Sequence, residues 1–162
     1  MDATEELNNP LSRFSLTIFR VNGLLMRNGD SVTRSIGQSS ARWQVLGRAG
    51  YQPQTVAHMA RDMGHARQSV QRVADVLAKE GLVRYKDNPT DRRAQLLELT
   101  PEGENVLAAI YALNEEWSRH IMAKLDPGQL INLADALEQI AQILEVNEPR
   151  TRIETTRRKD SL

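Results

Sequence analysis

Two arginines and two glutamines lie within six residues of one another near the middle of the chain: Arg67, Gln68, Gln71 and Arg72. If this stretch is helical, Gln68 and Arg72 project on the same side, with Gln71 beside them. Glutamine can pair with the adenine edge in a DNA major groove, and arginine can pair with O6 and N7 of guanine. Arg67 lies at the start of the stretch, where a backbone phosphate is the better partner. Any helix surface is polar, so this set alone is weak support for DNA recognition.

A second charged group lies in a stretch rich in turn-forming residues, 87–94, and consists of Asp91, Arg92 and Arg93. The segments on either side, 82–86 and 94–99, have the composition of two short strands. A lone two-stranded hairpin is marginally stable, so it must lean on helices. The sequence therefore predicts a charged hairpin that packs against neighbouring helices.

The residues before the hairpin predict two helices joined by a turn. Thr55 can cap the first helix, which Gly64 ends, and the second is expected over about 66–80, with Gly81 as its stop. The buried face of the second helix is fixed by four apolar residues at helical spacing, Val70, Val73, Ala74 and Leu77. Two helices joined by a glycine-containing turn form a helix-turn-helix unit, whose second helix suits a major groove. A hairpin directly after it gives that unit a wing.

The segment before this unit is expected to hold two more helices. Residues 10–29 carry one apolar seam at helical spacing after an Asn-Pro start signal. Residues 30–38 are polar and are interpreted as a loop, after which a serine at 39 or 40 can cap a helix to about Arg48. Trp43 in that helix is either a core residue or part of the wall of a ligand pocket.

The expected fold is mainly α with a small β-hairpin wing. A winged helix-turn-helix DNA-binding domain is expected over 39–100, and a helical dimerisation region over 10–29 and 101–146. Those helices have more apolar surface than one small winged domain needs to cover itself, which predicts a homodimer, most simply a two-fold symmetric one. The tails, 1–9 and 149–162, are expected to be disordered. The second tail is basic, and is either a DNA-seeking segment or a solvated end.

Charge is segregated along the chain although the formal net charge is zero. Residues 42–100 hold ten Lys/Arg and six Asp/Glu, whereas 101–148 hold two and nine. Such segregation suits a protein that meets phosphates with one region only. There is no cysteine, no apolar run of about 18 residues and no signal peptide, so we expect a cytoplasmic protein without a membrane segment or thiol chemistry.

Enzyme and metal sites lack their sequence signals. The chain has no phosphate-cradling glycine loop, zinc-binding helix motif or nucleophile elbow. The three histidines, His58, His65 and His120, do not have the spacing of metal ligands. We therefore expect neither catalysis nor a metal or other cofactor.

The wing and its flanks resemble the MarR family of bacterial winged helix-turn-helix transcription regulators. The residues that carry the resemblance are Leu77, Lys79-Glu80-Gly81-Leu82-Val83, Asn88-Pro89-Thr90-Asp91-Arg92-Arg93-Ala94, Leu97 and Leu99-Thr100-Pro101-Glu102-Gly103. The order of the flanking helices also fits, so the resemblance covers about residues 10–146. Two positions depart from the family's pattern: His65 and Ala66 stand where similar proteins have an apolar residue and a Ser or Thr cap.

The resemblance implies roles for the wing. It implies that Arg93 reaches a minor groove and that Asp91 holds the Arg93 guanidinium in place, while Arg92 lies near a phosphate. A narrow minor groove does attract arginine, and a carboxylate can orient a guanidinium. The other reading is that Asp91 only makes the turn and Arg93 is solvated.

The resemblance also implies a transcription regulator; a repressor is expected, with an activator as the alternative. Double-stranded DNA is the expected partner, through a palindromic operator whose half-sites lie about one helical turn apart. Similar proteins often bind small aromatic or phenolic anions between the dimer helices and the DNA unit, so a small-molecule inducer is expected, although no pocket residue can be assigned from the sequence. The competing hypothesis is a winged domain used for protein interaction, without sequence-specific DNA binding.

Overall fold

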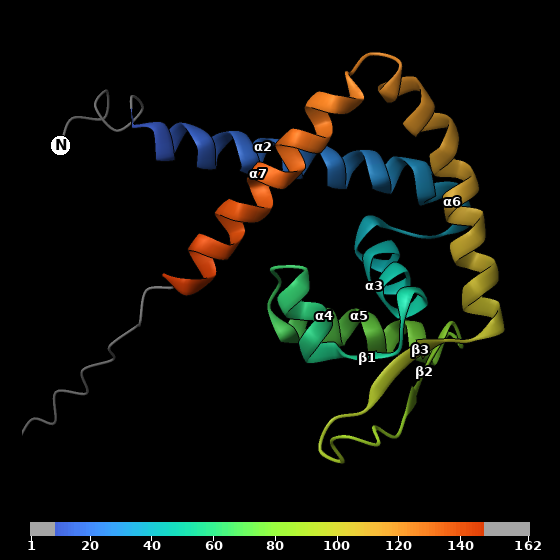
Figure 1. The fold of residues 1–162 in the computed structure, drawn as a ribbon. Coiled ribbons are helices and arrows are strands. Elements are labelled where there is room, and N and C mark those ends of the chain that lie inside the picture. The colour runs from blue at the N-terminus through green and yellow to red at the C-terminus, as the bar shows by residue number, and fades with distance from the viewer. Residues whose placement is uncertain (1–8, 148–162) are drawn as a thin grey trace, which may run out of the picture. The chain divides into compact units, whose positions relative to one another are not determined.

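The computed structural model describes residues 9–147, which form two compact units divided after Arg119. The predicted fold class is confirmed, and one strand is added to the hairpin. The elements of the first unit are α2 (Pro10–Thr33), the 3-10 helix η1 (Arg34–Ile36), α3 (Ser40–Tyr51), β1 (Gln54–Thr55), α4 (Val56–Asp62), α5 (Arg67–Lys79), β2 (Val83–Lys86), β3 (Leu96–Leu99) and most of α6 (Pro101–Met122) (Figure 1). The second unit holds the end of α6 and α7 (Pro127–Val146). Of the predicted tails, only Asn9 lies within the described residues, and it caps α2.

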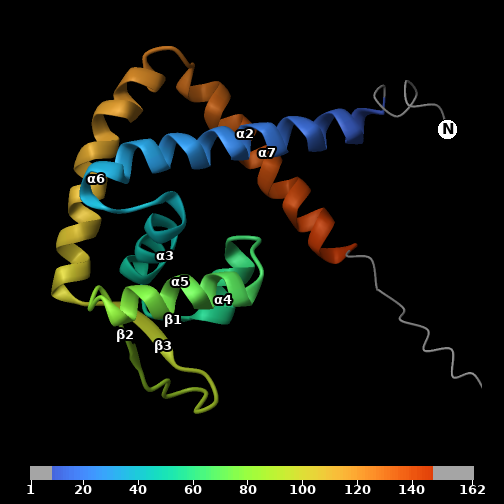
Figure 2. The same cartoon turned by 180° about the vertical axis from the view of Figure 1, so that it is seen from behind.

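The sheet is antiparallel, with β3 between β1 and β2. Val83 pairs with Leu99 and Tyr85 with Leu97, so the hairpin has the expected partners. The unexpected strand is β1, where Gln54 pairs with Leu97. Figures 1 and 2 show the loop between β2 and β3 projecting from the sheet, away from α3.

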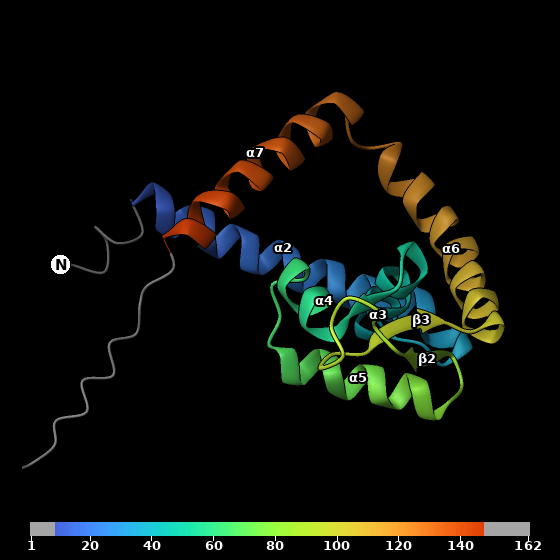
Figure 3. The same ribbon diagram turned by 60° about the horizontal axis from the view of Figure 1, so that its bottom comes forward.

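One hydrophobic core holds α3, α4, α5, the sheet and the first half of α6 together. Its fully buried side chains include Leu46, Met59, Leu77, Leu97 and Ile110. The inward face predicted for the second helix of the helix-turn-helix is confirmed, since Val70, Ala74 and Leu77 are buried and Val73 packs partly buried against the core. In the helix before it, Val56, Met59 and Ala60 are buried. Fully burying such a side chain stabilises the fold by about 1.5–3 kcal/mol, so this core fixes which face of α5 is left for solvent (Figure 3).

The end predicted for the first helix was wrong. The helix does not stop near Gly29 but runs to Thr33, so part of the predicted loop 30–38 is helical. Gly29 is buried, and a Cβ added there would collide with the Ser40 hydroxyl. Thr33 is buried too and donates its hydroxyl to the Gly29 carbonyl at 2.9 Å. Gly29 is therefore a site of close helix packing within a continuous helix.

The end predicted for the helix that follows, α3, was also too early. It is capped by Ser39 as expected, but it continues past Arg48 to Tyr51. Gly50, which lies beyond the predicted end at about Arg48, is inside the helix, where an added Cβ would be 2.8 Å from Leu107 and 2.9 Å from Leu99. Here again the missing side chain lets another element come close.

The second unit contains a helix with a clear start signal. Asp126 caps α7 by accepting from the Gln129 amide at 2.7 Å, and Pro127 occupies the first turn. Several large apolar side chains of α7 are more than half exposed, namely Ile131, Leu133, Ile143, Leu144 and Val146. None of the helices among residues 9–147 has the length and apolar character needed to cross a membrane.

Candidate nucleic-acid interface

The outer face of α5 carries the predicted reading residues. Arg67, Gln68 and Arg72 are exposed, and within residues 9–147 none of them joins a side-chain hydrogen bond or an ion pair. The N-cap residue of α5 is Ala66, which provides no side-chain cap, in agreement with the missing hydroxyl at this position. Three donor-bearing side chains are thus free to meet another molecule.

Gln71 differs from its neighbours because it is half-buried and tied to the wing. Its Nε2 donates to Asp75 Oδ1 at 2.8 Å and to the Tyr85 hydroxyl at 2.7 Å. The Tyr85 hydroxyl in turn donates to Asp75 Oδ1 at 2.7 Å. A carboxylate only accepts hydrogen bonds, so the amide nitrogen of Gln71 must face Asp75. Both N–H groups are used, and Oε1 is the atom left to meet a base.

This arrangement narrows what Gln71 can read. Bidentate pairing with adenine needs both the amide oxygen and the amide nitrogen. As held here, Gln71 offers one acceptor, which suits the amino group of adenine or cytosine. Burial, together with the hydrogen bond to Asp75 and the charge of its carboxylate, raises the pKa of Tyr85 to about 12. The hydroxyl therefore stays protonated and keeps the contact intact at neutral pH.

Tyr85 and Asp75 were not identified as functional from the sequence. Their signal was present in the spacing: Asp75 lies four residues after Gln71, so the two share a helix face. Tyr85 lies two residues after the buried Val83 on β2, and therefore points to the same side of the sheet. That side faces α5.

The wing has paired charges along its strands and unpaired charges near its tip. Glu98 of β3 bonds Arg84 at 2.7 Å and Lys86 at 2.8 Å, and these two cations hold the pKa of Glu98 below its usual value. Arg92 and Arg93 are exposed and form no ion pair in the part of the chain that the structure describes. The positive charge available for a phosphate is thus concentrated near the tip.

Asp91 differs from what the resemblance implied. Its Oδ1 accepts the backbone N–H of Arg93 at 2.9 Å, and no ion pair within the described range joins it to the Arg93 guanidinium. An Asp side chain readily accepts from the amide two residues ahead, as in an Asx turn. Asn88 does the same with Thr90 at 3.0 Å. In this structure Asp91 shapes the backbone of the tip and leaves the guanidinium free.

Side-chain contacts connect α3, the end of α5 and the flanks of the wing. Arg42 of α3 forms a two-pronged ion pair with Glu80 at the end of α5, one prong being 2.9 Å, and this contact lowers the pKa of Glu80. Gly81, in the left-handed region with φ +76°, ends the helix, and its carbonyl accepts the Thr100 hydroxyl at 2.6 Å. The first contact joins α3 to the end of α5, and the second joins the two flanks of the hairpin directly after that helix end.

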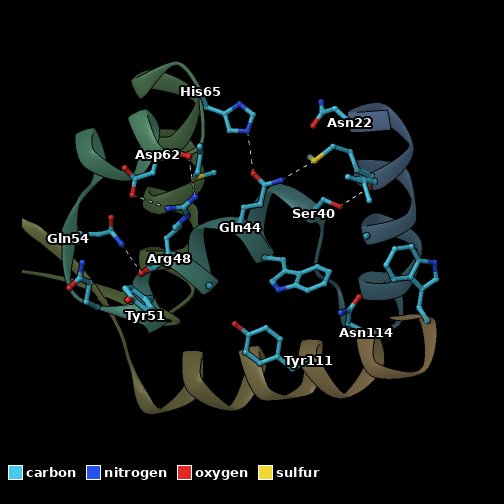
Figure 4. Close-up of a pocket in the computed structure, with 18 residues that line it drawn as sticks. Asn22, Ser40, Gln44, Arg48, Tyr51, Gln54, Asp62, His65, Tyr111 and Asn114 are labelled. Atoms are coloured by element: carbon cyan, nitrogen blue, oxygen red, sulfur yellow. Dashed lines mark hydrogen bonds and ion pairs between the residues drawn. The ribbon is translucent and has the colours of Figure 1, made fainter. Parts of the chain in front are cut away.

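A separate pocket with a volume of about 910 Å³ lies within the first unit (Figure 4). Its wall comes from α2, α3, the segment 52–54, the end of α4 with the turn after it, and α6. Four aromatic side chains line it, namely Trp43, Tyr51, Tyr111 and Trp117. Trp43 and Tyr111 meet edge to face with centroids 6.5 Å apart. Trp43 also packs against the core, so it is a core residue that lines this cavity, and a ligand-binding role for it stays a prediction.

The polar part of the pocket reaches the start of α5. Figure 4 shows Gln44 of α3 between His65 and α2. Gln44 Oε1 lies 3.3 Å from His65 Nε2, and Gln44 Nε2 donates to the sulfur of Met26 at 3.0 Å. His65 directly precedes Ala66, the N-cap residue of α5. The pocket wall thus includes the turn that leads into the reading helix.

Comparisons with known proteins agree with this architecture. The sequence profile of the MarR family matches residues 36–94. An uncharacterized protein of Mycobacterium tuberculosis is 34% identical over 143 residues, which are 88% of this chain and all of that protein. Two solved structures share the fold: CouR of Rhodococcus jostii bound to p-coumaroyl-CoA, and the M. tuberculosis transcriptional regulator MosR in complex with DNA.

The structural matches cover most of each chain. CouR has a TM-score of 0.72 at 22% identity, over 83% of this chain and 94% of CouR. MosR has a TM-score of 0.69 at 21% identity, over 83% of this chain and 97% of MosR. The chain belongs to the MarR family of winged helix-turn-helix transcription regulators.

Proposed function

We propose that this protein is a homodimeric repressor that binds a palindromic operator and leaves it when a small molecule occupies the pocket. The observation that carries the proposal is that one compact unit presents α5 and the wing tip with four exposed arginines that form no ion pair within residues 9–147, namely Arg67, Arg72, Arg92 and Arg93. Each subunit places α5 in the major groove, with Gln68 and Arg72 at base edges, and the wing in the flanking minor groove.

The dimer is supported by apolar surface that one copy leaves uncovered. On α2, Leu11, Leu16 and Phe19 are 60%, 55% and 71% exposed. On α7, Ile131 and Ile143 are 63% and 60% exposed. Apolar seams this long on two helices are unusual for a monomer, and a two-fold interface covers both copies with the same contacts. Two copies then present two reading helices, which requires an operator with two-fold symmetry.

Release by a small molecule is supported by the position of the pocket. A ligand that contacts Gln44 or His65 acts on the turn that sets the start of α5. It can shift the protein only through a difference in affinity between the DNA-binding arrangement and another arrangement. CouR, a structure of the same fold, holds p-coumaroyl-CoA, so a bound small molecule is compatible with this architecture.

Selection from random duplex DNA tests the proposal. We expect an enriched sequence with two inverted half-sites, bound by two protomers. Arg93→Ala should then weaken operator binding at moderate salt by more than twofold, because it removes one charge from each wing. Arg34→Ala is a matched control, since Arg34 is exposed in η1, outside α5 and the wing.

The competing function, protein interaction without specific DNA, has the opposite outcome. No sequence would be enriched, duplex binding would not depend on salt, and Arg93→Ala would leave the affinity within twofold. Any wing role in DNA binding would then be wrong. A screen of small aromatic compounds for release of the selected duplex tests the inducer separately.

A further inference from the structure

The charged side chains of the pocket cancel one another. Arg48 Nη1 lies 3.0 Å from Asp62 Oδ2, and Arg48 Nη2 donates to the Asp62 carbonyl at 3.2 Å. Arg48 is the one Lys or Arg among the described residues that line the pocket, and Asp62 is the one Asp or Glu. The guanidinium that could have received an anion is thus already bound to a carboxylate.

An anionic ligand would enter this pocket without a free counter-ion. It would lose water and then lie near Asp62, unless it drew Arg48 away and left that carboxylate with His58 Nε2, at 3.3 Å, as its remaining side-chain partner within residues 9–147. The Arg48 and Asp62 side chains are 40% and 32% exposed, so the cost is moderated by solvent. We therefore expect a penalty of about tenfold in affinity, rather than complete exclusion.

The remaining polar groups suit an uncharged ligand with a hydrogen-bond donor. Gln54 is 5% exposed, and its Nε2 donates to the Arg48 carbonyl at 3.0 Å. This contact fixes the amide orientation, since the reverse would place two oxygens together. Gln54 Oε1 is buried and accepts no hydrogen bond from the residues in the described range. A buried acceptor of this kind gains from a ligand N–H or O–H.

The aromatic wall sets the shape of the ligand. Trp43 and Tyr111 meet edge to face, and Trp117 lies in the same lining. Flat apolar rings pack well against such side chains. A volume of about 910 Å³ holds a ligand of drug size.

We propose that the pocket takes an uncharged aromatic compound that carries a hydrogen-bond donor, such as an aryl amide, in preference to the corresponding carboxylate. This inference rests on the proposed effector role of the same pocket. It departs from the aromatic or phenolic anion that the sequence resemblance implied. The selectivity comes from the Arg48–Asp62 pair.

Matched ligand pairs test the inference without DNA. Cinnamamide and cinnamate, and indole-3-acetamide and indole-3-acetate, differ mainly in charge. Binding is measured by calorimetry and by tryptophan fluorescence at pH 8, where carboxylates are ionised and an ordinary histidine, with a pKa of about 6.5, is neutral. We expect each amide to bind about tenfold more tightly than its carboxylate, with little dependence on salt.

Asp62→Asn tests whether the Arg48–Asp62 ion pair causes the preference for uncharged ligands. It keeps the size of the side chain but removes the negative charge that neutralises Arg48, so the affinity for the carboxylates should rise about tenfold while the affinity for the amides changes little. Glu115→Gln is the control, because it removes a carboxylate from another arginine pair, with Arg119 at 2.9 Å, outside the pocket.

Three results would overturn the inference: equal or tighter binding of the carboxylates, no binding of any of the four compounds, or an Asp62→Asn variant with unchanged preference. The effector role itself fails in a different way, namely if the amides bind the free protein but do not release a selected operator.

Discussion

The salt dependence of DNA binding follows from which cations are already paired. On α5 and the wing tip, Arg67, Arg72, Arg92 and Arg93 form no ion pair among the described residues. A dimer therefore brings up to about eight arginine charges to the duplex, at phosphates or in the grooves. If each is counted as one neutralised phosphate, each lowers the slope of log K against log salt by about 0.9. The slope should approach −7, which is a loss of about 10⁴-fold in affinity between 50 and 200 mM salt.

Arg92→Ala isolates one contact in each subunit. The slope should become less steep by about 2, because two charges leave the dimer interface. Arg84→Ala removes the same formal charge from the wing, but Arg84 is already bound to Glu98 at 2.7 Å, so its slope should change by much less. Fluorescence anisotropy with a labelled operator at four salt concentrations measures both. Equal changes in the two variants, or no change in Arg92→Ala, would refute this reasoning.

Three further predictions concern single residues. Tyr85→Phe removes a hydroxyl that bonds two side chains of α5, and should lower the free energy of unfolding by about 1 kcal/mol at pH 7. The pKa of Tyr85 is raised from 10.0 to about 12 in the folded protein, so the stability that the hydroxyl contributes is complete below pH 10 and is lost as the pH rises through 12. Urea titrations should therefore show that the difference in free energy of unfolding between wild type and Tyr85→Phe becomes smaller by pH 11. Gly103→Ala should lower the free energy of unfolding by about 1–3 kcal/mol, because the added Cβ collides with the Leu82 carbonyl. Gly23→Ala is the control: its Cβ meets only a flexible side-chain end at 3.6 Å, so it should be neutral or stabilising. A similar thermal stability of the two variants would contradict the packing around Gly103. Gln44→Ala should leave operator affinity nearly unchanged but reduce release by an aryl amide, as measured by anisotropy; full release would show that the signal takes another route.

The glycines explain which helix ends could be predicted from the sequence. Gly64 and Gly81 have φ angles of +62° and +76°, and both were correctly taken as helix stops. Gly29 and Gly50 have the same sequence signal, yet they lie inside helices where another element approaches closely. Whether a glycine ends a helix or admits a neighbour depends on what packs against it, and that information is distant in the chain.

In the sheet and in the candidate interface, too, features that depend on contacts between distant residues could not be predicted from the sequence. The hairpin could be predicted because its turn formers and strand residues are local. The strand β1 could not, because two residues form it only when Leu97 lies beside Gln54. The outward residues of α5 followed from its apolar spacing. The bonds of Gln71 to Tyr85 and of Asp91 to the Arg93 backbone depend on the folded geometry of the wing.

A hydroxyl-radical footprint on the selected operator, combined with the mass of the complex, tests most directly whether paired subunits present two reading helices to one face of DNA. The account predicts two protomers per duplex and two protected regions on one face, centred about one helical turn apart. A single protomer per duplex, or protection spread around the duplex without that spacing, would contradict it.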